Sequence, residues 1–318
     1  MITEERVTTD FEQDVILGLK ENPKRLFSKY FYDELGDKLF QEIMRMEEYY
    51  LTRSEFEIFS TQKESILDAL SIKDEKIQLI EFGAGDGFKT KLLLKSLVDR
   101  HVDFEYIPID ISSTVLKELE NSLKENMPSL AVRPIEDSYF SALEKLKSNQ
   151  KKLVLFLGSN IGNFRREEAV QFLSTANQYF NEGDLFLLGV DLKKHPETIL
   201  AAYNDKLGIT KAFNLNLLER INRVLGADFD LSQFDHYPTY DPISGETKSF
   251  LISLKDQIVE LPKLNQSVHF KYAEPIFMEI SKKYSVDELE TLSMETGFTL
   301  VNHFFDCKHY FVDTLWKK

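Results

Sequence analysis

The middle of the chain alternates short apolar runs with longer segments of helical periodicity. The apolar runs span 77–82, 105–109, 153–157 and 185–190, with a weaker run at 130–133. Apolar residues at helical spacing occupy 90–99, 112–125, 139–147 and 166–180. Buried parallel strands are continuous apolar runs rather than alternating ones. The pattern therefore predicts a doubly wound, Rossmann-like α/β sheet.

The end of the chain departs from this alternation. Residues 285–297 read as a helix, with Ser285 as its N-cap and Gly297 as its stop. Two strand candidates follow at 298–306 and 309–316, and the two-residue link between them requires an antiparallel hairpin. A five-strand parallel sheet that ends in a helix and a hairpin is the topology of class I methyltransferases. A dinucleotide dehydrogenase would more often carry a sixth parallel strand.

Residues 196–281 separate the fifth strand from the final helix and are too long for a loop. We interpret them as an inserted lobe. The segment 1–60 is helical in pattern and rich in aromatic residues. We therefore expect a methyltransferase domain from 61–195 and 282–318, and a substrate-binding lobe from 1–60 and 196–281.

Bulk properties narrow the classes of function. The chain has 318 residues, of which 42% are hydrophobic and 29% charged, so it can bury a sizeable core. A net charge of −14 argues against a nucleic-acid or anionic-membrane partner. The single cysteine, Cys307, excludes an intrachain disulfide, and the sequence shows neither a signal peptide nor a membrane-length apolar run. We therefore expect a cytoplasmic protein.

The stretch 81–90, EFGAGDGFKT, follows the first strand and precedes the first helix of the sheet. A strand, a glycine loop and a helix N-terminus in this order aim backbone N–H groups at a ligand. The spacing Gly83-x-Gly85-x-Gly87 matches neither the dinucleotide G-x-G-x-x-G pattern nor a P-loop. The loop alone leaves the ligand open, and a tight turn without a ligand is the alternative.

Polar residues follow the next three strands at the edge where ligands of such sheets bind. Asp110 ends the second strand and can accept both hydroxyls of a ribose. The alternatives are a helix N-cap and a solvated aspartate. Asp137 follows the third strand, where such folds meet an adenine amino group, or it is a surface residue. Asn163 follows the fourth strand and offers a donor and an acceptor, although it could instead cap the next helix.

Several longer stretches then carry a resemblance to a known family. They are KYFYDELGDKLFQEI, EEYYLTRSE, EFGAGDGFKT, LFLGSNIGN, AAYNDKLGITKAFNLNLLERINRVLGADFD and FMEISKKYS. In this order they resemble the ergothioneine-pathway L-histidine Nα-methyltransferase family, which uses S-adenosylmethionine. The resemblance runs from about residue 20 to the end, and the fifth stretch is highly specific.

The resemblance implies roles for matching residues. Tyr32, Gly83 and Lys89 would hold the methionine part of the cofactor, while Asp110 would hold its ribose and Asp137 its adenine.

The same resemblance implies the substrate site. Asn163 and Tyr203 would hold the amino acid carboxylate and would be the catalytic residues, and the Gly158 carbonyl would face the amine. The residues that would surround the imidazole are Tyr49, Glu279 and Ser281. Elementary geometry agrees for the last pair, since residues two apart on a strand share a face and can both bond one ring.

Three positions depart from the family pattern. Phe88 stands in the glycine loop where a Glu is expected, and Ser138 replaces an aromatic residue expected beside the adenine, for which Tyr139 can compensate. Ser249 stands where relatives place a Met against the substrate ring.

The resemblance predicts a monomeric S-adenosylmethionine-dependent enzyme that methylates the α-amine of L-histidine, without a metal. The alternatives are an Nα-methyltransferase for tryptophan, another amino acid or a histidine derivative, and an inactive binding protein of the same fold.

Overall fold

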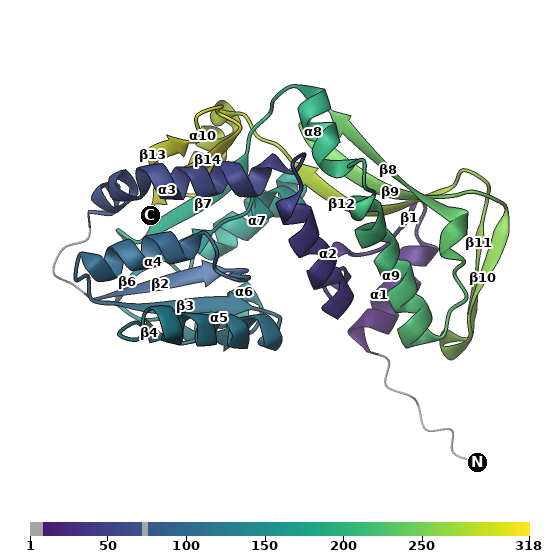
Figure 1. Ribbon diagram of the computed structural model, residues 1–318, viewed down its shortest axis with the longest axis horizontal. Helices are drawn as coiled ribbons and strands as arrows, with labels where there is room; N and C mark the ends of the chain where they lie inside the picture. Colours follow the sequence, from purple (N-terminus) through teal and green to yellow (C-terminus); the bar gives the residue numbers. More distant parts are fainter. Residues whose placement is uncertain (1–8, 72–75) are drawn as a thin grey trace, which may run out of the picture. The chain divides into compact units, whose positions relative to one another are not determined.

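The structure, a computed structural model, describes residues 9–71 and 76–318, and these residues divide into two compact units (Figure 1). The sheet unit comprises Leu51–Lys193 and Lys282–Lys318. The insertion unit comprises Lys194–Ser281 and the described part of Met1–Tyr50. The boundary between the units therefore falls within the segment 1–60, at the start of helix α3 (Tyr50–Leu70).

The sheet unit is built on a mostly parallel sheet with the strand order β13-β14-β7-β6-β2-β3-β4, and β5 also pairs with β3. Every residue of β2 and of β7 is buried, which explains why these strands read as continuous apolar runs. The predicted parallel α/β sheet is confirmed. Its parallel strands are β2 (Ile77–Phe82), β3 (Phe104–Asp110), β4 (Ala131–Val132), β5 (Ile135–Glu136), β6 (Lys151–Phe156) and β7 (Leu185–Asp191).

Helices connect these strands and bury one apolar stripe each. The stripe of α4, for example, is Leu93, Leu94 and Leu97, all fully buried. The core joins strand residues such as Phe82 and Phe186 to residues of the helices. The connecting helices are α4 (Thr90–Asp99), α5 (Ser113–Asn126), α6 (Tyr139–Lys145) and α7 (Arg166–Asn177).

The third strand differs from the expected single run at 130–133. It is two short strands, β4 and β5, on either side of Pro134. Arg133 still donates its N–H to the Tyr106 carbonyl at 2.9 Å. Proline has no N–H to donate, so the ladder breaks at this residue and resumes after it.

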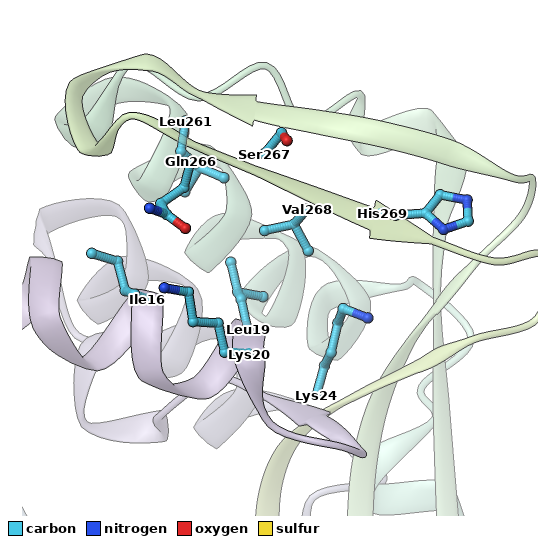
Figure 2. Close-up of a pocket in the computed structure, with 9 residues that line it drawn as sticks. All are labelled: Ile16, Leu19, Lys20, Lys24, Leu261, Gln266, Ser267, Val268 and His269. Carbon is cyan, nitrogen blue, oxygen red and sulfur yellow. The ribbon is translucent and has the colours of Figure 1, made fainter.

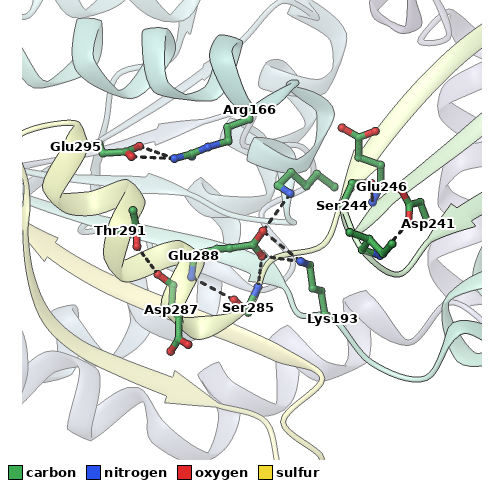
Figure 3. A network of polar contacts seen from close by, with 12 residues as sticks. Arg166, Lys193, Asp241, Ser244, Glu246, Ser285, Asp287, Glu288, Thr291 and Glu295 are labelled. Atoms are coloured by element: carbon green, nitrogen blue, oxygen red, sulfur yellow. Dashed lines mark hydrogen bonds and ion pairs between the residues drawn. The ribbon is translucent and has the colours of Figure 1, made fainter.

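The C-terminal helix and hairpin are confirmed as α10 (Val286–Glu295), β13 (Thr299–Phe305) and β14 (Phe311–Lys317). The Ser285 hydroxyl accepts the Glu288 N–H at 3.2 Å, and the Glu288 carboxylate accepts the Ser285 N–H at 2.7 Å (Figure 3). This reciprocal cap fixes the helix start. Strand β14 pairs antiparallel with both β7 and β13.

The insertion unit has its own sheet, in the order β1-β12-β9-β8, and a separate β10–β11 hairpin. Its core packs Phe213, Leu217 and Ile221 of α9 with Leu251 and Met278 of the sheet. The strands are β1 (Lys24–Arg25), β8 (Phe234–Asp241), β9 (Glu246–Ser253), β10 (Gln257–Leu261), β11 (Gln266–Phe270) and β12 (Pro275–Lys282); the helices are α1 (Asp10–Lys20), α2 (Glu34–Arg45), α8 (Pro196–Tyr203) and α9 (Ile209–Leu225).

Helix lengths and hydropathy bear on membrane insertion. Within residues 9–71 and 76–318, none of the helices is long and apolar enough to cross a membrane.

Candidate active site

The glycine loop joins β2 to α4 in a backbone conformation that favours glycine. Gly83, Gly85 and Gly87 have φ angles of 64°, 54° and 64°. A side chain at Gly85 would meet nothing within 4 Å, so open space lies beside this residue. A Cβ at Gly87 would come within 2.6 Å of Leu119, so that end of the loop is closed by packing. The loop therefore exposes backbone next to a space where a ligand can lie.

A second loop meets the glycine loop at Gly83. A Cβ there would lie 3.0 Å from the Tyr139 hydroxyl and 3.3 Å from Asn160 Nδ2. The Asn160 amide is also 3.9 Å from the Cβ position of Gly158. Asn160 is therefore a further candidate site residue. The stretch LFLGSNIGN contains both Asn160 and Asn163, and its pattern alone gave no reason to choose Asn160.

Asp110 lies at the carboxyl end of β3, beside the glycine loop. Its Oδ2 accepts the Gly85 N–H at 3.4 Å, and its Oδ1 accepts the Ser112 N–H at 3.0 Å. Ser112, not Asp110, is the N-cap of α5. The structure thus brings Asp110 to the glycine loop and rejects the helix-cap alternative.

Asp137 follows β5, and residues of the next helix, α6, hold its carboxylate. Its carboxylate accepts hydrogen bonds from Lys145 Nζ at 2.5 Å, the Ser141 hydroxyl at 2.7 Å and the Ser138 N–H at 2.7 Å. The bonds from Lys145 and Ser141 lower the pKa of Asp137 to about 2. Asp137 is therefore a fixed anion, and its side chain keeps 20% of its surface exposed.

Lys89 and Gly158 meet around a carboxylate that the sequence did not single out. Lys89 Nζ forms an ion pair with Glu55 of α3. Glu55 also accepts the Gly158 N–H, at 2.8 Å to Oε1 and 3.1 Å to Oε2. Lys89 Nζ lies 3.6 Å from the Cβ position of Gly158. Two residues predicted for different ligands are thus neighbours in the sheet unit.

Asn163 ends η2 (Asn160–Asn163), after a turn in which Gly158 and Ser159 have φ angles of 73° and 60°. Its side chain is exposed. The N-cap of α7 is Arg165, whose N–H donates to Glu168 at 2.8 Å. The capping alternative for Asn163 is therefore wrong.

In the insertion unit, the structure joins two predicted substrate residues directly. The Tyr203 hydroxyl, at the end of α8, donates to the Ser281 hydroxyl on β12 at 2.8 Å. Both side chains are buried. Glu279 lies two residues before Ser281 on the same strand and is partly buried. These three polar side chains lie on α8 and β12. The two elements contain parts of the stretches AAYNDKLGITKAFNLNLLERINRVLGADFD and FMEISKKYS, which carry the family resemblance.

Two predicted tyrosines also belong to the insertion unit. Tyr32 precedes α2 and packs edge-on against Phe40 and Phe213, with ring centroids 5.6 and 5.8 Å apart. Its side chain is exposed enough to contact a ligand. Tyr49 lies between α2 and α3 and packs against the core of this unit.

The structure shows what surrounds the three positions that depart from the family pattern. Phe88 stacks on Phe56 of α3 with ring centroids 4.7 Å apart, which attaches the glycine loop to that helix. Ser138 is the N-cap residue of α6, and Tyr139 beside it stacks on Phe82 at 4.7 Å. Ser249 is a buried residue of β9, and nothing in the structure explains its replacement of Met.

The described residues contain a pocket of about 210 Å³, which is unrelated to these candidates. It lies between α1 and the β10–β11 hairpin of the insertion unit (Figure 2). Of its two lysines, Lys20 and Lys24, the second forms an ion pair with Glu274. No residue predicted for cofactor or substrate lines this pocket. Among residues 9–71 and 76–318, no group of three or more His, Cys, Asp or Glu side chains could hold a metal ion.

Comparison with known proteins shows which family the chain resembles. Residues 11–318 match the model of a family described as histidine-specific methyltransferase, SAM-dependent.

Three curated relatives agree with this match. A histidine N-alpha-methyltransferase from Mycolicibacterium smegmatis is 34% identical over 90% of this chain and 88% of its own length. One of the same description from Mycobacterium tuberculosis is 32% identical over 86% and 84%. Ergothioneine biosynthesis protein 1 from Neurospora crassa is 32% identical over 89% of this chain but only 32% of its own length.

Proposed function

Because the chain belongs to the family of histidine-specific, S-adenosylmethionine-dependent methyltransferases, we propose that it methylates the α-amine of L-histidine. The family match over residues 11–318 carries this proposal. The substrate and the methylated atom are those that the names of the two bacterial relatives state for those proteins.

The residues of the sheet unit fit the cofactor. The open space beside Gly85 is next to Asp110, whose Oδ2 makes only a long bond of 3.4 Å and keeps capacity to accept ribose hydroxyls. Lys89 offers an ammonium to the methionine carboxylate, and Asp137 offers a fixed anion to the adenine amino group. Gly83 also belongs to this unit, and the family resemblance adds Tyr32, a residue of the insertion unit.

The insertion unit supplies the chemistry that recognises an imidazole. Glu279 can accept a ring N–H in a charge-assisted bond, which an apolar side chain cannot form. The Ser281 hydroxyl, which accepts from Tyr203, lies on the same strand as Glu279 and would be a second polar contact for the ring. Tyr49 would complete the ring site, and the Gly158 carbonyl would accept from the amine.

The chain's own residues act by holding and orienting the substrate. S-adenosylmethionine supplies a methyl group on an electrophilic sulfonium sulfur. Asn163 and Tyr203 would bind the substrate carboxylate and so aim the amine at that methyl group, which is where positioning lowers the barrier. The amine attacks as a neutral nucleophile, so the rate rises with pH until the amine is fully deprotonated.

We further propose up to three successive transfers, giving trimethylhistidine for ergothioneine synthesis, in a monomeric, cytoplasmic enzyme without a nucleic-acid or membrane partner. The name of the Neurospora relative supports this pathway. The acidic net charge supports the absence of polyanionic partners.

Ser249 favours one alternative, a different aromatic acceptor such as tryptophan, because a serine enlarges a site that a Met would narrow. The test is the wild-type kcat/KM for L-histidine and for L-tryptophan, measured with saturating S-adenosylmethionine. A higher value for histidine supports the proposal. A higher value for tryptophan contradicts it and makes Ser249 the decisive residue.

A further inference from the structure

The sheet unit contains a cluster of buried charges that the proposed function does not explain. Glu55 of α3 and Asp313 of β14 are both fully buried, and Lys89 lies against them with 20% of its side chain exposed. Burying charged groups is costly, so a cluster of this kind is retained only where its members pair with one another.

Glu55 makes contacts with both candidate ligand sites. Its carboxylate is paired with the Lys89 ammonium and accepts the Gly158 N–H through both oxygens. Lys89 is the residue proposed for the cofactor carboxylate, and Gly158 belongs to the loop proposed for the substrate amine. The Glu55 carboxylate therefore fixes one residue proposed to bind the cofactor and one proposed to contact the substrate.

Strand β7 has a glycine at the position that contacts the Glu55 carboxylate. Gly189 lies in the middle of β7, where glycine weakens a strand and needs an explanation. A Cβ at this position would overlap Glu55 Oε1 and would lie 3.0 Å from Asp313 Oδ1. Asp313 is the direct partner of Gly189 in the ladder between β14 and β7. The glycine therefore makes room for Glu55 to lie beside Asp313.

The surroundings of Asp313 favour its protonated form. Burial raises the pKa of Asp313 well above its ordinary value, and the charge of Glu55 raises it further, while Lys89 opposes them. Within the described residues no donor bonds either Asp313 oxygen. A protonated Asp313 can itself donate to Glu55, and the cluster is then neutral: one carboxylate, one carboxylic acid and one ammonium.

We propose that Glu55 is a positioning residue of the methyl transfer, which keeps Lys89 charged and aimed for the cofactor while it holds the Gly158 turn in place. This role rests on the proposed function, since it assumes that Lys89 binds the cofactor carboxylate. Asp313 supports it by giving Glu55 a neutral neighbour in place of a second charge.

The charge state of Lys89 depends on the groups that face it. Burial is the largest single influence and lowers the pKa of Lys89. The charge and hydrogen bond of Glu55 act against burial, as do the charges of Glu81 and of Asp313 where it is ionised, so the pKa is raised. Without the Glu55 charge, burial is opposed by Glu81, whose own pKa is about 7, and by Asp313 only where it is ionised. Burial would then lower the pKa of Lys89 relative to its value in the wild type.

The experiment compares three proteins: wild type, Glu55→Gln, and Glu57→Gln as the matched control. Glu57 lies on the same helix and accepts the Cys307 N–H at 2.9 Å. Calorimetry gives the Kd of S-adenosylhomocysteine from about pH 6.5 to about pH 8.5, a range in which an ordinary lysine stays charged.

We expect the ratio of the Glu55→Gln Kd to the wild-type Kd to rise with pH, approaching about tenfold per pH unit above the lowered pKa of Lys89. The ratio for Glu57→Gln stays flat. A Glu55→Gln ratio that is flat across the range overturns the proposal, because a merely structural loss would weaken binding equally at each pH. No binding by wild type would instead refute the cofactor assignment itself.

Glu55→Asp keeps the test decisive if Glu55→Gln does not fold. The shorter side chain keeps the charge but cannot reach both Lys89 and the Gly158 N–H. We expect a weaker but pH-independent affinity relative to wild type. An affinity equal to that of wild type would contradict the positioning role.

Discussion

Replacing Asp110 with alanine tests how the cofactor is held. The Asp110 side chain is anchored by the Ser112 N–H at 3.0 Å, and its other oxygen makes only the 3.4 Å contact with Gly85. That oxygen is therefore available to a ribose hydroxyl. Hydrogen bonds to a charged group contribute about 1.5–3 kcal/mol. Asp110→Ala should weaken S-adenosylhomocysteine binding by that amount, or about 10- to 150-fold in Kd.

Calorimetry measures this change, and Asp103→Ala is the matched control. Asp103 is exposed and precedes the opposite end of the same strand, so its replacement should leave the Kd unchanged. Loss of the Ser112 bond should itself cost about 0.5–1.5 kcal/mol of folding stability, which urea unfolding reports separately. An unchanged Kd in a folded Asp110→Ala variant would remove Asp110 from the cofactor site.

Two further predictions concern substrate choice and pH. Glu279→Ala should raise the KM for histidine, because a buried ring N–H loses its acceptor, with a smaller effect on cofactor binding. It should also relax discrimination against tryptophan. Unchanged histidine kinetics would show that Glu279 does not face the ring. Burial raises the pKa of Glu81 to about 7, although Thr90 and Tyr106 bond it. The folded state then binds this proton more tightly than the unfolded chain, so between about pH 4.5 and pH 7 wild type should lose about 3 kcal/mol of stability relative to Glu81→Gln. Urea unfolding at several pH values tests this, and parallel stability curves for the two proteins would contradict it.

The elements that sequence predicted well are those with strong local signals. The runs at 77–82 and 185–190 are buried on both faces, so their apolar pattern is continuous. Helix α4 spans 90–99 as its periodicity indicates, and Ser285 caps α10 as its residue type indicates. The split third strand was missed, although Pro134 was visible, because its neighbours suit a strand.

The charge cluster was beyond sequence reasoning. Three distant segments contribute Glu55, Gly189 and Asp313. Each has an ordinary local interpretation: a helix residue, a weak strand position and a strand carboxylate. Only the ladder between β7 and β14 places Asp313 opposite Gly189. The roles of Asn163, Tyr203 and Glu279 came from the resemblance, because their residue types alone suit many surfaces.

The identity and position of the methylated product test the central claim most directly. The protein would be incubated with S-adenosylmethionine and each of the twenty amino acids, and products analysed by tandem mass spectrometry. The account predicts that L-histidine is the preferred acceptor and gains methyl groups on its α-nitrogen, with mono-, di- and trimethylated species in succession. Methylation of the imidazole ring, or a higher kcat/KM for another amino acid, would contradict it.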